Sequence, residues 1–359
     1  MPNDEVRLES ELYECPTCGA NLKFLPEKEA LYCEYCEMTI SLKGEASNEE
    51  LDFHENCDKK VKDWDSETKV VHCDNCGANN VISKYEITSN CPFCGSASVV
   101  DANELVGEKP NRVIPFKISK ADVHTNYKKW LKKKFFVPRK IKKDIPNPLL
   151  SGVYIPSWTY DTKTFSTYEG RLGKRYTRTV GSGKNKRTVT EIRYFRVNGS
   201  HQVKHDDILV CSGTKLQQPV LDSLAPYDTN NSYVYDERYL AGFSAEHYKF
   251  TLKEGWFIGK KKADILIRNQ ILSKYNYDVV DYLNVHTSYH EIKYKYVILP
   301  VWICIYKYNK KDYTFMVNGE TGKIVGKTPV SPLKVVLVVL LALAFLMLFL
   351  YAFMYGESL

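Results

Sequence analysis

The pattern of hydrophobic and polar positions changes most sharply near the C-terminus. Residues 335–354 form an uninterrupted run of 20 uncharged, mostly aliphatic residues, and Pro332 precedes the run. A helix of that length crosses about 30 Å of hydrocarbon. We therefore predict one transmembrane helix over residues 332–355, followed by a short tail over 356–359, in preference to a buried core helix.

A helical period follows Ser119, which forms the pattern of a capping box with Asp122. Apolar residues then recur on one face and predict a buried stripe: Val123, Tyr127, Trp130, Leu131 and Phe135. Pro138 is expected to end this helix. A second helix is predicted near residues 253–275.

Strand-like patterns fill the space around these helices. Ile155-Pro156-Ser157-Trp158 recurs 144 residues later as Leu299-Pro300-Val301-Trp302, and alternating aromatic residues follow each copy. Asn318-Gly319 and Thr321-Gly322 predict the last hairpin turn. We interpret these segments as two related β units, each completed by a helix, within one β-rich α+β domain over 101–331.

The cysteines form two matched sets near the N-terminus. Of the 11 cysteines, eight fall into four Cys-x-x-Cys pairs, with 14 residues between the pairs of each set and an offset of 58 between the sets. Repetition at this fidelity indicates a duplicated module. The eight residues are Cys15, Cys18, Cys33, Cys36, Cys73, Cys76, Cys91 and Cys94.

This spacing suits structural zinc. Two Cys-x-x-Cys knuckles supply four sulfurs at about 2.3 Å from one Zn²⁺, and a small module gains folding free energy from the metal. A disulfide framework is disfavoured because no secretory signal precedes the cysteines. A catalytic zinc is disfavoured because four thiolates leave no position for water. We expect two structural zinc ions.

The other candidate ligands are interpreted more plainly. Cys57 and His54 lie between the two sets and are either spare ligands or, in our preferred interpretation, linker residues. Cys211 and Cys304 lie in strand-like runs and are expected to be small buried residues.

Charge separates the two parts of the chain. The whole chain has a formal net charge of +7, but residues 1–100 hold 9 Lys+Arg and 20 Asp+Glu, so the basic excess lies downstream. The expected α+β multidomain organisation is zinc ribbon 1 (1–46), a linker (47–66), zinc ribbon 2 (67–100), the basic α+β domain (101–331), the transmembrane helix (332–355) and the tail (356–359).

The positions of the Lys and Arg residues predict how the chain is oriented in the membrane and which segments lie near lipid. Lysines precede the apolar run and none follows it, so the positive-inside rule places the bulk of the chain in the cytoplasm, anchored in the cell membrane by its tail. Nine Lys and Arg residues between Lys128 and Lys143 are expected near anionic lipid. A second basic run over 170–190 predicts a long hairpin or loop, either simply solvated or in contact with anionic lipid or an acidic partner.

The paired ribbons, the Ile-Pro-x-Trp strand, the segment from Pro300-Val301-Trp302 to Thr321-Gly322-Lys323 and the terminal apolar helix together resemble a bacterial family. It is the family of transcription-factor-IIB-type zinc-ribbon membrane proteins. The resemblance implies a non-enzymatic membrane protein, in some relatives beside flotillin-like (SPFH) or phage-shock-type proteins in envelope-stress assemblies. Some relatives carry the label of a primosomal replication helicase, but this chain lacks the phosphate-binding loop of such an enzyme.

Three functions are compatible with these patterns. A membrane-tethered adaptor or scaffold is favoured. A membrane-anchored nucleic-acid-binding protein is the alternative, and the acidic ribbon half would then leave contact to the basic middle domain. The third is an enzyme of unknown class, for which His201 and His205, with Asp206 and Asp207, would lie on a turn, and His286 and His290 would share a helical face. Surface or structurally satisfied histidines are the preferred interpretation of all four. No catalytic residue is assigned.

Overall fold

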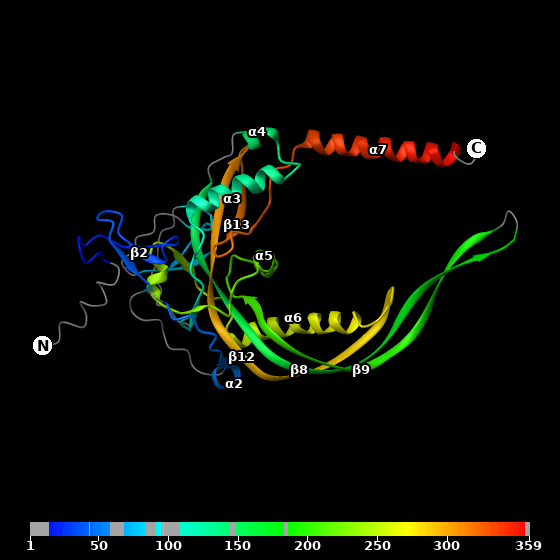
Figure 1. Cartoon of the computed structure of the whole chain (residues 1–359), viewed down its shortest axis with the longest axis horizontal. Coiled ribbons are helices and arrows are strands. Elements are labelled where there is room, and N and C mark those ends of the chain that lie inside the picture. Colours follow the sequence, from blue (N-terminus) through cyan, green and yellow to red (C-terminus); the bar gives the residue numbers. More distant parts are fainter. Residues whose placement is uncertain are drawn as a thin grey trace.

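The computed structural model describes residues 14–42, 44–57, 68–83, 91–94, 96, 108–143, 148–182 and 186–355. The predicted α+β class is confirmed: two small cysteine-rich units adjoin a β-rich body, and one long apolar helix leaves that body (Figure 1).

The described elements include the helices predicted after Ser119, near residues 253–275 and over residues 332–355. The strands are β1 (Lys23–Leu25), β2 (Ala30–Tyr32), β3 (Thr39–Ser41), β4 (Leu51–Asp52), β5 (Thr68–His72), β6 (Asn79–Ser83), β7 (Arg112–Val113), β8 (Leu149–Val180), β9 (Arg187–Cys211), β10 (Tyr233–Val234), β11 (Ser244–Glu246), β12 (Val279–Tyr308), β13 (Lys311–Asn318) and β14 (Ile324–Gly326). The helices are α2 (Phe53–Asn56), α3 (Lys120–Lys133), α4 (Arg139–Lys143), α5 (Gln218–Leu224), the 3₁₀ helix η3 (Glu237–Leu240), α6 (Leu252–Leu272) and α7 (Pro332–Tyr355).

Two very long antiparallel strands, β8 and β12, form the axis of the body. β9 pairs with the other edge of β8, while β4, β7 and β13 pair in turn along the other edge of β12. β11 joins β8 to β6, so the sheet continues into the second cysteine unit, whereas β1, β2 and β3 form a small sheet of their own. The second basic run lies in the β8–β9 hairpin, as predicted.

Burial along β8 shows how the layers are arranged. Residues 153–162 are buried on both faces, but from Lys163 to Gly170 every second residue is exposed. Strict alternation means that one face of the strand is covered and the other meets solvent. Helix α6 supplies the cover, and Figure 1 shows it lying inside the curve of β8, β9 and β12.

The two repeated motifs serve the same structural purpose, which confirms the two predicted β units. The indole N–H of Trp158 donates to the carbonyl of Phe250 at 2.9 Å, and that of Trp302 donates to the carbonyl of Ile118 at 2.9 Å. Each carbonyl directly precedes the capping residue of a helix, Thr251 of α6 and Ser119 of α3. Both helices begin with a complete capping box. Each unit therefore fixes the start of its helix in the same way.

Helix α3 differs from its prediction at the C-terminal end. Val123, Tyr127 and Leu131 are buried against the sheet, but Phe135 is 59% exposed and does not belong to the buried stripe. The helix ends at Lys133, before Pro138, because Lys134 already has extended backbone angles. Phe135 lies beyond the end of the helix, so its side chain no longer follows the helical period and cannot extend the stripe.

The segment between the cysteine units contacts the body wherever it is described. β4 pairs with β12, and Phe53 is buried among the aromatic residues beneath α6. The buried Arg112 guanidinium donates to the Glu49 carbonyl at 3.0 Å, and the buried Lys295 ammonium donates to Asn48 Oδ1 at 2.9 Å. Residues 47–57 thus pack as part of the body. The predicted domain boundaries themselves remain predictions, and residues 58–67 and 356–359 lie outside the described residues.

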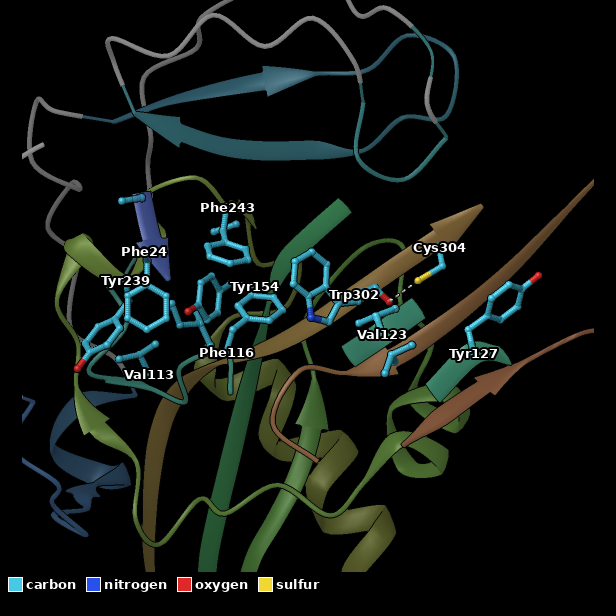
Figure 2. Packing of buried hydrophobic residues seen from close by; sticks show 14 of the residues in the cluster. Phe24, Val113, Phe116, Val123, Tyr127, Tyr154, Tyr239, Phe243, Trp302 and Cys304 are labelled. Carbon is cyan, nitrogen blue, oxygen red and sulfur yellow. Dashed lines mark hydrogen bonds between the residues drawn. The ribbon is translucent and has the colours of Figure 1, made fainter. Parts of the chain in front are cut away.

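An aromatic cluster joins the first cysteine unit to the body (Figure 2). Phe116 stacks on Phe243 with ring centroids 4.2 Å apart, and Trp302 packs edge-on against Phe116 at 5.0 Å. Phe24 of β1 reaches the same cluster and packs against Tyr239 at 5.3 Å. Burial of aromatic side chains is the main favourable contribution to such a junction.

Helix α7 has the length and composition that membrane crossing requires. Its span Pro332–Ala352 covers 21 residues, and none of them is buried against the rest of the protein. A helix that is apolar all round and unburied is unfavourable in water.

Candidate metal centres

The first cysteine unit brings two knuckles together. Backbone N–H groups of Gly19 and Glu37 donate to the carbonyls of Cys15 and Cys33 at 2.8 and 3.0 Å. Both donors have a left-handed backbone, with φ of 71° and 60°. Cys15 Sγ lies 3.3 Å from Cys36 Sγ, and Cys18 Sγ lies 3.4 Å from Cys33 Sγ. The chain therefore crosses two tight turns whose thiols converge.

The second unit repeats this arrangement. Gly77, with φ of 68°, donates to the Cys73 carbonyl at 2.6 Å. Cys73 Sγ lies 3.7 Å from Cys94 Sγ, and Cys76 Sγ lies 3.7 Å from Cys91 Sγ. The eight predicted cysteines thus form two groups, in each of which all four sulfurs lie within 4.8 Å of one another.

The spacing of the sulfurs fits a tetrahedral metal ion. Four thiolates at about 2.3 Å from Zn²⁺ stand about 3.8 Å from one another. In both groups the paired sulfurs lie close to that spacing. Each group can therefore bind one metal ion, and soft thiolate donors in this geometry select zinc or iron–sulfur chemistry over magnesium or calcium.

Neighbouring hydrogen-bond donors lower the pKa of two cysteines in each group, Cys15 and Cys33 in the first and Cys73 and Cys94 in the second. Burial raises the pKa of Cys15, but the backbone N–H of Thr17 and the Cys36 thiol outweigh it and lower that pKa to about 6. Burial is likewise outweighed at Cys94, where Ser96 and Asn75 lower the pKa to about 6. The motif did not predict Ser96 or Asn75, although Ser96 stands only two residues after Cys94. Hydrogen bonds of this kind orient metal ligands.

Both units are held against the body by backbone contacts. In the first unit the N–H of Phe24 donates to the Ala241 carbonyl at 2.9 Å. In the second, β6 pairs with β11, and the Lys215 ammonium donates to the carbonyl of the ligand Cys76. The knuckle that contains Cys73 and Cys76 is thus in direct contact with the body.

The remaining cysteines are placed as the sequence predicts. Cys211 and Cys304 are buried, and burial raises the pKa of the Cys211 thiol to about 12. Cys57 is half-buried at the end of α2, and among the described residues neither Cys57 nor His54 belongs to a group that could hold a metal. Both residues lie between the cysteine units, in the segment 47–57 that packs against the body.

The four candidate catalytic histidines are not arranged as expected. His201 and His205 lie on β9, and His286 and His290 lie on β12, so neither pair occupies a turn or a helix. Residues four apart on a strand point to the same face but are separated by about 13 Å along it. His201 is instead 2.8 Å from Gln270 of α6.

A third group of acidic side chains was not predicted, because its members are far apart in the sequence. Carboxylates of Glu50, Asp161 and Asp206 lie within 4.8 Å of one another. Lysines surround them: Lys204 pairs with Asp206 at 3.4 Å, and the buried Lys295 lies 3.8 Å from Glu50. This cluster lies where β8 and β9 shift register, between Tyr160 and Thr162 of β8. We interpret it as a partly buried polar network that ties the 47–57 segment to the sheet.

Comparison with known proteins identifies one homologous relative. Over 325 residues the chain is 31% identical to the "Uncharacterized protein YdjG" of Bacillus subtilis (strain 168), and the match covers 90% of this chain and 91% of that relative. The chain belongs to the same family. Because the match covers 90% of this chain, it extends well beyond the cysteine units. No model of a known protein family matches the chain, and no solved structure shows a significant match.

Proposed function

We propose that this protein is a non-enzymatic, membrane-tethered adaptor whose bulk lies in the cytoplasm. Its two four-cysteine groups would each hold a structural Zn²⁺, and its body would form a platform close to the lipid. The resemblance to transcription-factor-IIB-type zinc-ribbon membrane proteins supports this proposal.

The contact between the body and the start of α7 carries the proposal. The backbone N–H of Ser331 donates to the Phe136 carbonyl at 2.8 Å. The Lys334 ammonium donates to the carbonyls of Phe135 and Val137, both at 2.7 Å. An anchor held in this way would keep the segment after α3 at the membrane surface, whatever direction α7 takes beyond Lys334.

The composition of that segment suits a bilayer surface. Phe135 and Phe136 are 59% and 41% exposed, and their rings meet edge-on at 5.3 Å. We call this pair, with the nine cations from Lys128 to Lys143, the anchor foot. Exposed aromatic rings enter the headgroup region, and each nearby Lys or Arg gains about 1 kcal/mol from anionic lipid.

The cysteine units would provide the recognition surface. Tyr35, which stands between the ligands Cys33 and Cys36, is 81% exposed. Exposed tyrosines on rigid turns are frequent energetic centres of protein interfaces. On the resemblance, we propose an SPFH/flotillin-like or phage-shock-type protein as the partner.

Partner binding can be tested with the full chain in nanodiscs and purified proteins of those two classes from the same genome. We expect one of them to bind, and Tyr35→Ala to weaken its affinity about tenfold without loss of metal. Tyr282→Ala is the matched control, because Tyr282 is 42% exposed on β12, away from the cysteine units. Absence of binding by both classes, or equal losses in both variants, would contradict the proposal.

The lipid contact is tested separately. In nanodiscs that contain brominated phosphatidylserine, the emission of an introduced Phe135→Trp should be quenched. A Tyr35→Trp variant should not be quenched, because Tyr35 belongs to the first cysteine unit. Equal emission of the Phe135→Trp variant with brominated and ordinary lipid would show that the anchor foot does not contact the membrane.

A further inference from the structure

The end of the β8–β9 hairpin is a free two-stranded ribbon. β12 begins at Val279, which pairs with Gly173, and α6 ends at Leu272. Beyond Gly173 only β8 and β9 continue, paired from Lys174–Arg193 to Val180–Arg187. Asn276 and Asp278, which follow α6, contact Lys174 and the backbone N–H of Arg175 at the base of the ribbon. From Tyr176 to Thr179 the described residues of β8 are exposed, and Figure 1 shows the ribbon projecting far from the body. We call residues 171–196 the basic arm.

The fold does not require this extension. In the sister unit β12 ends at Tyr308 and turns back at once into β13. With the offset of 144 between the units, Tyr308 corresponds to Thr164, yet β8 runs on to Val180. A hairpin that extends beyond its own helix gains little burial and needs another explanation.

The arm carries more positive charge than the whole chain does in net terms. Residues 171–196 contain six Arg, three Lys and one acidic residue, Glu191, against a net charge of +7 for the chain. Arg178 pairs with Glu191 at 2.6 Å, and Arg171 pairs with Asp281 at 2.6 Å. Among the described residues, no carboxylate pairs with Arg187, Arg193 or Arg196. Such a surface needs a polyanionic partner.

The cations occupy both faces of the ribbon. Register partners share a face, so Lys174, Arg178, Arg187 and Arg193 lie on one face, and Arg171, Arg175 and Arg196 lie on the other. The second face also carries the threonine pairs Thr177–Thr190 and Thr179–Thr188. A flat bilayer can be met by only one face at a time, whereas a groove between two rows of phosphates meets both.

We propose that the basic arm binds double-stranded DNA by entering its major groove. Seven residue pairs beyond Gly173 give the ribbon a length of about 23 Å. The major groove of B-form DNA, about 12 Å wide, admits a two-stranded ribbon. Arginine is the residue best suited to phosphate and base edges, and threonine hydroxyls add hydrogen bonds. This inference goes beyond the adaptor function and does not depend on it.

The composition separates the arm from the anchor foot. The anchor foot has eight Lys, one Arg and the exposed Phe135–Phe136 pair. The arm is rich in Arg, and its described turn residues, Gly181 and Ser182, are small and polar. A hairpin that inserts into lipid would carry apolar residues at its tip. Because the arm and α7 project to the same side in Figure 1, anionic lipid is the competing occupant.

The test uses the full chain, loaded with zinc, in phosphatidylcholine nanodiscs. A fluorescent mixed-sequence DNA duplex is titrated at several salt concentrations. The arm variant Arg175→Ala/Arg187→Ala/Arg196→Ala should weaken binding at least tenfold and reduce the slope of log K against log salt by about three. The matched control Lys128→Ala/Lys129→Ala/Lys133→Ala removes the same charge from the anchor foot, and its affinity for DNA should stay within about twofold.

The other outcomes overturn the proposal. DNA binding that is absent, or that falls equally in both triple variants, would mean that no groove-binding arm exists. Without DNA, quenching of a Tyr194→Trp variant by brominated phosphatidylserine would assign the arm to the bilayer instead. Folding of the triple variants is checked by their zinc content and thermal unfolding, which exposed arginines should not change.

Discussion

Ile155 of β8 lies directly opposite Leu299 of β12, the residue that holds the same place in the second copy of the motif. A residue that pairs with its own counterpart in an antiparallel ladder lies on a local two-fold axis. The neighbouring contacts obey the same symmetry: the Pro156 carbonyl accepts from the N–H of Ser212 at 2.9 Å, and the Pro300 carbonyl accepts from that of Gly319 at 2.8 Å. The body is thus built from two related units.

The two motif tryptophans should contribute equally to stability. Trp158→Phe and Trp302→Phe each remove an indole donor from a buried carbonyl, and we expect each to lower the free energy of unfolding by about 1–3 kcal/mol. Urea titration of the full chain in detergent measures this. Trp256→Phe is the control. Trp256 belongs to α6, and its ring packs against Tyr160 and Phe53, whereas the motif tryptophans bond to the carbonyl before a helix start. A control loss as large as the others would contradict the assignment.

Helix α6 approaches the sheet so closely that one glycine is required. A Cβ at Gly255 would stand 2.5 Å from the Tyr160 hydroxyl and 2.8 Å from Trp158 Cδ1. The Tyr160 hydroxyl cannot move away without losing its hydrogen bond to the Leu252 carbonyl, at 2.7 Å. Gly255→Ala should therefore destabilise the protein by about 1–3 kcal/mol despite the better helix propensity of alanine. A thermal shift upward would show that the helix can retreat at no cost.

Metal content should follow the two cysteine groups independently. We expect two zinc ions per chain by native mass spectrometry. Cys33→Ser should remove the first ion, and Cys73→Ser should remove the second, because a tetrahedral site loses most of its affinity with one thiolate. Cys57→Ser, which lies outside both groups, should retain two ions. A wild-type chain that folds with fewer than two ions would refute the zinc assignment.

Stability should fall as the pH rises, because of Asp161. Burial, and then the neighbouring Asp206 carboxyl, raise the pKa of Asp161 to about 8, above its unfolded value of about 3.9. Between these values the folded state binds more protons than the unfolded state, so unfolding becomes easier as pH increases through that window. Asp161→Asn keeps the acceptor for the Asp207 N–H, at 2.9 Å in the wild type, and removes the titration.

The effect is measured by urea unfolding at pH 6, 7, 8 and 9. The free energy of unfolding of Asp161→Asn, relative to that of the wild type, should rise by at most about 1.4 kcal/mol per pH unit up to pH 8. Above pH 8 this difference should stay constant. A constant difference between the two proteins over the whole range would mean that Asp161 is already ionised at pH 6.

The sequence predictions that succeeded rest on residues that lie close together in the sequence. The Cys-x-x-Cys pairs identified both four-thiol groups, and Ser119 with Asp122 marked the start of α3. These features succeed because each knuckle or cap lies within a few residues of sequence. The turn considered for His201 and His205, and the helical face considered for His286 and His290, are absent for the opposite reason: β9 and β12 continue through those positions as strands, which depends on long-range pairing.

The sequence by itself determined the two four-cysteine groups, the apolar helix and the repeated motif, since each is a pattern of residue types at short or regular spacing. Only the tertiary structure decided that Ile155 meets Leu299, that Lys295 is buried beside Glu50, and that the basic arm runs free of α6 and β12. Register, burial of charge and the end of a covering helix depend on contacts between residues more than 100 positions apart. Such contacts arise from packing of the whole chain, and no local period records them.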